Sequence, residues 1–261
     1  MDHKIFTPCL LPCLLALALA APGAPAQTTA SATPAAPATP AVDPATVKAL
    51  KDMGAYLQSL QRFHVTNELT GERVLSDGQK LQHMASAAVD VERPNRLHVT
   101  MSSARSQREL FYDGKLVTLF TPAQKYYATV PFDGSLGDLA NALQTKYGVD
   151  LPLADLFVLG TPAAPLDKLD SAMNAGQDFV GDDLCDHYAL RQGDFDWQIW
   201  ITIGNKPVPR KLVITNRGDE ARPQSVSLID WDLKPAFATS SFTFKPAKSA
   251  KAIEVVPRKT Q

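Results

Sequence analysis

The sequence is poor in cysteine and has no excess of charge of either sign. Only 3 of its 261 residues are cysteine, and 26 Lys and Arg stand against 27 Asp and Glu, which gives a formal net charge of −1. A nucleic-acid-binding surface needs clustered Lys and Arg to neutralise phosphates, so this balance argues against a nucleic-acid partner. Hydrophobic residues make up 45% of the chain, which is enough to form a globular core.

Long apolar runs are also missing beyond the N-terminus, since no stretch there reaches the length of about 18 residues that a transmembrane helix needs. The apolar stretch at residues 5–21 follows Lys4 and precedes the small-x-small sequence Ala24-Pro25-Ala26. A basic start, a short apolar segment and such a cleavage site are typical of a secretory signal peptide. We therefore expect residues 1–26 to be a signal peptide, with an uncleaved N-terminal anchor as the alternative. No transmembrane segment is expected after cleavage.

Cleavage would leave Cys185 as the only cysteine, because Cys9 and Cys13 lie within the expected signal. A lone cysteine cannot form an internal disulfide, and between apolar neighbours it is more typical of a buried side chain than of a nucleophile. Residues 27–44 consist almost entirely of Gln, Thr, Ala, Ser and Pro, which cannot bury enough surface to offset the entropy of ordering. We expect a disordered Pro/Ala-rich linker there and one folded domain over residues 45–261.

The sequence lacks the motifs that mark common catalytic and phosphate-binding sites. It contains no G-x-S-x-G, H-E-x-x-H, G-x-G-x-x-G or G-x-x-x-x-G-K-[ST]. Two weaker patterns remain. Asp183, Cys185 and His187 would share one face of a strand and could offer a metal three ligands, and His187 beside Asp186 could serve a hydrolase. Because neither pattern is specific, we expect no enzymatic activity, no catalytic residue, no metal site and no cofactor.

Apolar residues at spacings near three and four predict an amphipathic helix over residues 45–60, and the preceding Asp43-Pro44 is typical of a helix start. A second helix is predicted over residues 136–147, between a capping serine and a terminating glycine. A short apolar helix is predicted over residues 152–159. These helices interrupt a chain that is otherwise dominated by strand signals.

Short segments of β-branched and aromatic residues, separated by turn residues, predict antiparallel strands. We expect them at residues 63–74, 80–91, 96–101, 109–112, 116–120, 125–130, 183–190, 195–203, 210–216, 225–233 and 241–244. Between the two groups we expect a loop with a short helix around residues 166–173. Trp200 lies on the polar face of its strand, where it would pack under a loop or line an opening. Evenly spaced short strands indicate a meander of about ten strands rather than βαβ units.

The segments SLQRFHV, ERPNRLHV and ELFYDGKLVTLFTPAQKYYATV follow the first helix in that order. This order resembles the periplasmic lipoprotein-carrier superfamily typified by LolA and LppX. In that superfamily a Pro-x-x-Arg strand, a Tyr-Asp-Gly hairpin and a Pro-containing turn before an aromatic strand recur. The later segment DLCDHYALRQGDFDWQIWITIGNKPVPRKLVI resembles more narrowly the DUF2092 family of predicted periplasmic proteins. The resemblance spans about residues 45–257, nearly the whole expected domain.

The resemblance implies an α+β, mainly β fold, in which a strongly curved antiparallel sheet forms an unclosed half-barrel with covering helices. It implies a periplasmic, non-enzymatic carrier of a hydrophobic or acylated ligand, with a periplasmic or envelope protein as a further partner. Each acyl CH₂ buried in such a cavity would contribute about 0.8 kcal/mol. The alternative is a structural or protein-interaction module whose cavity is filled by its own helices.

Apolar residues on strands and covering helices are the candidates for lining this cavity. The strands are expected to supply Leu97, Val99, Met101, Leu110, Leu116, Trp197, Ile199, Ile201, Ile229 and Trp231. The helices are expected to supply Leu139, Leu143, Leu156 and Phe157.

Overall fold

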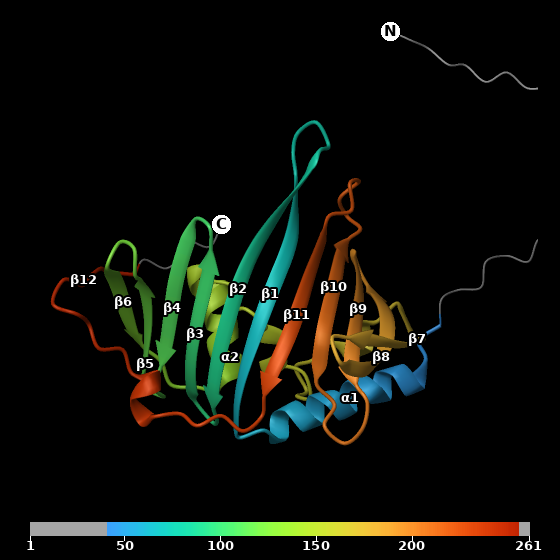
Figure 1. Ribbon diagram of the computed structural model, residues 1–261, viewed down its shortest axis with the longest axis horizontal. Coiled ribbons are helices and arrows are strands. Elements are labelled where there is room, and N and C mark those ends of the chain that lie inside the picture. Colours follow the sequence, from blue (N-terminus) through green and yellow to red (C-terminus); the bar gives the residue numbers. More distant parts are fainter. Residues whose placement is uncertain (1–40, 256–261) are drawn as a thin grey trace, which may run out of the picture. The chain divides into compact units, whose positions relative to one another are not determined.

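The computed structural model describes residues 41–255, which form one sheet of 12 strands with helices on one of its faces (Figure 1). The first group of strands is β1 (Arg62–Val74), β2 (Lys80–Glu92), β3 (Arg96–Ser103), β4 (Ser106–Tyr112), β5 (Leu116–Thr121) and β6 (Tyr126–Pro131). The second is β7 (Ser171–Val180), β8 (Asp183–Gln192), β9 (Phe195–Thr202), β10 (Pro209–Asn216), β11 (Gln224–Asp232) and β12 (Lys251–Ala252). The expected signal peptide and most of the expected linker, residues 1–40, lie outside the described residues.

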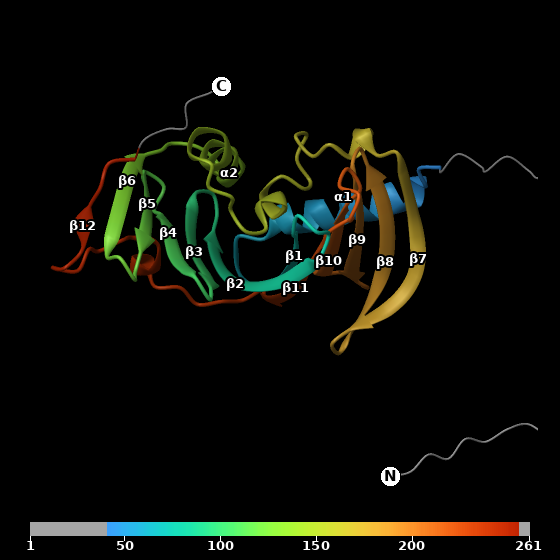
Figure 2. The same cartoon turned by 90° about the horizontal axis from the view of Figure 1, so that it is seen from above.

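Two antiparallel meanders make up the sheet, and they meet where β1 pairs with β11. The strand order is β12-β6-β5-β4-β3-β2-β1-β11-β10-β9-β8-β7, and β12 runs parallel to β6. Figure 2 shows that the sheet curves around the helices and does not close on itself. The predicted mainly β fold, an unclosed half-barrel with helices in its concave face, is confirmed.

Helix α1 (Pro44–Ser59) forms where the sequence predicted it, because its start is capped and one face is apolar. Asp43 is the N-cap, and its carboxylate accepts hydrogen bonds from the backbone N–H groups of Ala45 and Thr46. The apolar stripe enters the concave side of the sheet, where Leu50, Met53 and Leu57 have 0%, 0% and 1% of their surface exposed. Each such side chain contributes about 1.5–3 kcal/mol by burial.

The second helical region covers the other half of the concave face. Helix α2 (Leu136–Ala142) begins with a reciprocal capping box between Ser135 and Asp138, as the predicted cap requires. A π-helical turn (Leu143–Tyr147) continues α2 and ends at Gly148, and the 3₁₀ helix η2 (Ala154–Phe157) follows. The residues from 143 to 160, which lie over the concave face, are named the covering segment below.

Two rows of large apolar side chains run across the strands on the concave face. One row joins Val65, Val89, Val99 and Leu110 as directly opposed residues of β1, β2, β3 and β4, and each is 0–1% exposed. The other row, nearer the end of the sheet where α1 lies, joins Phe63, Val91, Leu97, Tyr112 and Val117. Directly opposed side chains are the stabilising unit of an antiparallel sheet. These rows and the helices form the main core.

The convex face is partly covered by the C-terminal segment, which Figure 2 shows running along the side of the sheet opposite the helices. Phe244 packs against Phe111, Phe120 and Tyr127, with ring centroids 5.4, 5.1 and 5.0 Å apart. Phe242 is 1% exposed. The aromatic residues of the first meander therefore hold this segment against the sheet.

Two sequence-based expectations about strands were wrong. Residues 241–244 do not form a strand, because the chain makes the 3₁₀ turn η4 (Thr239–Phe242) that seats Phe242. Strand β7 replaces an expected loop and short helix, although the 3₁₀ turn Leu166–Lys168 does form. The β7 sequence is rich in Ala, Asn, Gly and Gln, which have low strand propensity. It is held by pairing with β8 across the tight turn at Gly181, whose φ is 60°.

Helix α1 approaches the covering segment most closely at Gly54. A Cβ atom added to Gly54 would overlap the backbone of Gly160, and a Cβ on Gly160 would overlap that of Gly54. Gly160 also has a φ of 83°, in the left-handed region that favours glycine. Beside this crossing, Gln58 Nε2 donates a hydrogen bond to the carbonyl oxygen of Leu159 at 2.7 Å. The seating of the covering segment on α1 therefore depends on both glycines.

We predict that Gly54→Ala lowers the free energy of unfolding by about 1–3 kcal/mol, although alanine is the better helix former, because the added methyl has no space. The matched control is Gly137→Ala in α2, where the nearest atom, the Phe157 carbonyl oxygen, would lie at an ordinary 3.5 Å. That change should be neutral or stabilise the protein by up to about 1 kcal/mol. Urea unfolding measures both, and equal effects of the two variants would refute the close crossing.

Candidate functional site

A hollow opens on the concave face where the opposed side chains become small. Next to the packed valine row, the opposed residues of β1 to β4 are Asn67, Ala87, Met101 and Arg108. The following row is Leu69, Ala85, Ser103 and Ser106. Replacing Val and Leu by Ala and Ser leaves space that the covering segment does not fill. The result is a cavity of about 310 Å³.

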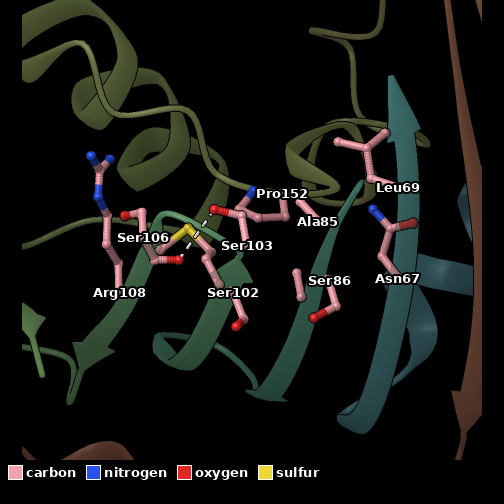
Figure 3. Close-up of a pocket in the computed structure, with 11 residues that line it drawn as sticks. Asn67, Leu69, Ala85, Ser86, Ser102, Ser103, Ser106, Arg108 and Pro152 are labelled. Atoms are coloured by element: carbon pink, nitrogen blue, oxygen red, sulfur yellow. Dashed lines mark hydrogen bonds between the residues drawn. The ribbon is translucent and has the colours of Figure 1, made fainter. Parts of the chain in front are cut away.

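Figure 3 shows this concave-face cavity with its lining residues. Besides the two rows, it is lined by Ser86, Ser102 and Pro152. Pro152 belongs to the covering segment, so the cavity lies between the sheet and the helical layer. The Arg108 guanidinium and the Ser103 and Ser106 hydroxyls come from β3 and β4, whereas β1 and β2 supply Leu69, Ala85 and Ala87 together with the Asn67 amide. The charged residue of the lining therefore lies at the β3–β4 end, which is the polar end of the cavity.

Asn67 is the unusual residue of this cavity. Only 6% of it is exposed, its Oδ1 is enclosed, and that oxygen has no hydrogen-bond partner among the described residues. Leaving a buried amide unsatisfied costs about 1–3 kcal/mol, so folded proteins rarely do so. The sequence held one signal for it, which was missed: Asn67 occupies a core-facing position in the alternating series Phe63, Val65, Asn67, Leu69.

The structure brings most of the sequence-predicted residues together, but as packed core. Leu97, Val99, Leu110, Ile199, Ile201, Ile229, Leu139, Leu143 and Phe157 are buried members of the main core, and Met101, Trp197 and Trp231 pack against it. Of this set, Met101 lines the concave-face cavity. The cavity begins one row beyond Val99 and Leu110, at Met101.

Leu116 and Leu156 stand apart from the other candidates. Leu116 is 46% exposed and precedes Val117, which belongs to the core. Because successive side chains of a strand point to opposite faces, Leu116 points away from the concave face, and its expected place in the cavity is corrected. The side chain of Leu156 lies outside what the structure describes.

A second hollow of about 570 Å³ lies beside the edge strand β7. Its lining includes Trp197 and the ion pair between Arg191 and Asp196, whose side chains form hydrogen bonds of 2.7 and 3.1 Å. It also includes Asp43, whose carboxylate caps α1. These charged groups already have partners within the protein.

Asp186 and His187, the residues considered for a hydrolase, point to opposite faces of the sheet. His187 lies on the convex face, stacked on Trp200 with ring centroids 4.0 Å apart, and its Nε2 is 2.9 Å from Gln198 Oε1. The adjacent residue Asp186 accepts hydrogen bonds from Gln177 and from the core residue Tyr188. The two side chains therefore cannot act as a dyad. Trp200, expected under a loop or at an opening, is 5% exposed and buried beneath its strand neighbours.

Cys185 and Asp183 are likewise engaged separately. Asp183 lies 2.8 Å from Arg210 Nε in an ion pair, whereas Cys185 is fully buried with Trp200 and Val213 in a small convex-face cluster. Burial, reinforced by the nearby Asp183 carboxylate, raises the pKa of the Cys185 thiol to about 11. Among residues 41–255, no group of three His, Cys, Asp or Glu side chains is arranged to hold a metal ion.

Two other histidines support the convex face through one carboxylate. His64 Nδ1 lies 2.6 Å from Asp90 Oδ1, and His98 Nδ1 lies 3.4 Å from Asp90 Oδ2. Burial raises the pKa of the Asp90 carboxyl, but the hydrogen bonds from His98 and His64 outweigh it and hold the pKa below its usual value. This arrangement links β1, β2 and β3 and fits a structural role for both histidines.

The fold and the cavity define a class of protein: a half-barrel with an apolar concave face, helices that cover most of it, and a hollow between the sheet and the covering segment. The particular family follows from the sequence. The model of the family described as predicted periplasmic protein (DUF2092) matches residues 46–256, so the chain belongs to that family, as the sequence motifs indicated. No curated protein matches the sequence significantly.

Solved structures with a similar fold have very different sequences. LppX, a lipoprotein of Mycobacterium tuberculosis, is 12% identical, with 75% of this chain and 98% of that chain covered and a TM-score of 0.48. LprF of Mycobacterium bovis is 12% identical, the match covers 76% of this chain and 97% of LprF, and the TM-score is 0.45. A LolA superfamily protein of Nitrosomonas europaea is 11% identical, the match covers 76% of this chain and 97% of that protein, and the TM-score is 0.36. In the part of the chain that the structure describes, no helix has the length and apolar character to cross a membrane.

We predict that Cys185 does not react with thiol reagents in the folded protein. With a pKa of about 11, about one thiol in a thousand is ionised at about pH 8, and the thiolate is the reactive form. Iodoacetamide followed by peptide mapping should find Cys185 unmodified in the native protein and modified in guanidinium. Rapid labelling under native conditions would contradict the burial described here.

Proposed function

We propose that this protein is a non-enzymatic binding protein that holds a hydrophobic, acylated ligand in the concave-face cavity and carries it through the periplasm. The observation that carries the proposal is the unfilled space between Ala87, Met101 and Pro152, beside the packed core. The hollow opens to solvent at its β3–β4 end, where Ser103, Ser106 and Arg108 are exposed. A hollow bounded by Ala, Leu, Met and Pro side chains suits hydrocarbon better than it suits a purely polar ligand.

The size of the cavity limits what it can hold without rearrangement. Its volume of about 310 Å³ lies at the lower end of the range of about 300–1,000 Å³ for ligand pockets. The cavity therefore accommodates part of one acyl chain. A longer chain would displace the covering segment, which is seated on α1 at Gly160 and by the hydrogen bond from Gln58. Loading and release would then be coupled to movement of this segment.

The second candidate function is a structural or protein-interaction module that fills its own concave face. It is favoured by the burial of the residues first expected to line the cavity, since Leu139 is 1% and Phe157 3% exposed. In this case the surface of the protein, rather than its interior, would meet a periplasmic or envelope partner. Ligand uptake separates the two functions.

We predict that the protein purified gently from the periplasm carries a stoichiometric acyl-bearing adduct, or takes up added lysophospholipid, in native mass spectrometry. Ala87→Leu should fill the cavity and weaken uptake by at least about tenfold, which corresponds to about 1.4 kcal/mol. The matched control is Ala88→Leu on the same strand, because Ala88 points to the convex face opposite Thr66 and Thr100.

Circular dichroism should show that both variants remain folded. A clean apo mass with no uptake of added lipid would favour the self-filled module. Uptake that is equally strong in the Ala87→Leu and Ala88→Leu variants would place any bound ligand outside this cavity.

A further inference from the structure

The geometry points to one class of ligand for this cavity: an acyl lipid that carries an anionic head group and a carbonyl oxygen close to it. This inference rests on the proposed function and specifies its ligand. The head group would lie against Arg108 at the β3–β4 end, the carbonyl would accept a hydrogen bond from Asn67, and the chain would begin along Ala85, Ala87 and Leu69.

The polar end of the cavity is built for an anion. Arg108 forms no ion pair or hydrogen bond with any described residue, so its guanidinium is free to bind one. The neighbouring Ser106 brings a hydroxyl group, which can donate a hydrogen bond to a phosphate or carboxylate oxygen, whereas the Ser103 hydroxyl already donates to the carbonyl oxygen of Ser106 at 3.3 Å. A guanidinium with five N–H donors is suited to bidentate binding of such groups.

Asn67 supplies the second polar contact. Figure 3 shows its Nδ2 directed toward Ala85 and its Oδ1 directed away from the cavity, and Oδ1 is the enclosed atom. An N–H donor on the cavity side requires an acceptor on the ligand, and a carbonyl oxygen is the acceptor that an acyl ester or amide provides. The side chain is more than nine-tenths buried, so this hydrogen bond would form away from bulk water, where it discriminates most.

The spacing of the two polar groups fits one molecule. Asn67 and Arg108 stand at the two ends of one row of opposed residues, with Ala87 and Met101 between them. Three strand intervals separate their backbones by about 14 Å. One lipid can bridge such a distance, with its anionic group at the Arg108 guanidinium and its carbonyl oxygen at the Asn67 amide.

The inference is tested with three single-chain probes titrated below their micelle concentrations at about 0.15 M ionic strength. Palmitoyl-lysophosphatidylglycerol has both the anion and the ester, monopalmitoylglycerol lacks the anion, and the ether-linked lysophosphatidylglycerol lacks the carbonyl. We expect the wild-type protein to bind the first about tenfold more tightly than the second and several-fold more tightly than the third.

Each binding preference should be lost when the residue responsible for it is replaced. Arg108→Gln should abolish the preference for the anionic probe, whereas Arg105→Gln should retain it, because Arg105 lies in the turn between β3 and β4 and does not line the cavity. Asn67→Leu should abolish the preference for ester over ether. It should also leave the melting temperature of the unliganded protein unchanged or raised, because it removes an unsatisfied buried amide.

The possible results distinguish a failure of this ligand assignment from a failure of the proposed function. Equal affinities of the wild-type protein for the anionic and neutral esters would overturn the inference and leave acyl binding intact. Equal losses in the Arg105→Gln and Arg108→Gln variants would also overturn it, since general charge attraction would then explain the preference. Failure of all three probes to bind would overturn both the inference and the proposed function.

Discussion

An antiparallel sheet with one apolar face is stable in water only if that face is covered, and the architecture of this protein follows from that requirement. The sheet is too wide to remain flat, so it curves, and α1 and the covering segment occupy the concave side. The rows containing Val65 and Phe63 form one core with the buried stripe of α1 and with Leu136 and Leu139 of α2. Where the side chains of the sheet become small, the helical layer does not fill the space above them, and this space is the cavity.

The sequence predicted those elements whose signals are local. Helix α1 has a capping aspartate, a proline in its first turn and a clear apolar stripe, and the hairpins have their turn residues, so these elements could be placed from the sequence alone. Strand β7 could not, because its residues have little strand propensity and it depends on pairing with β8. The 3₁₀ turn at Phe242 is set by tertiary packing of the C-terminal segment, which local pattern does not encode.

The apolar faces of the strands were predictable, but which face is concave and where the cavity lies were not. Alternation identified which side of β3 and β9 is apolar, and the structure places Leu97 and Ile199 of that side in the concave core. Which rows are covered by helices and which remain open depends on how far the covering segment reaches across the sheet. Asn67 was overlooked for the same reason, since a single polar residue in an apolar series has no evident meaning until the space around it is known.

The way the chain enters the domain has a mechanical consequence. Before α1 begins, the backbone pairs with the edge strand β7: Asp43 N donates to the carbonyl oxygen of Ala172 at 2.9 Å, and Ala172 N donates to that of Ala41 at 3.3 Å. A pulling force transmitted through the preceding residues would therefore load these two hydrogen bonds before it reaches the helix. If those bonds broke, the next group exposed to the force would be Asp43, the cap of α1, so tension at the N-terminus would act on the end of the helix that fills the concave face.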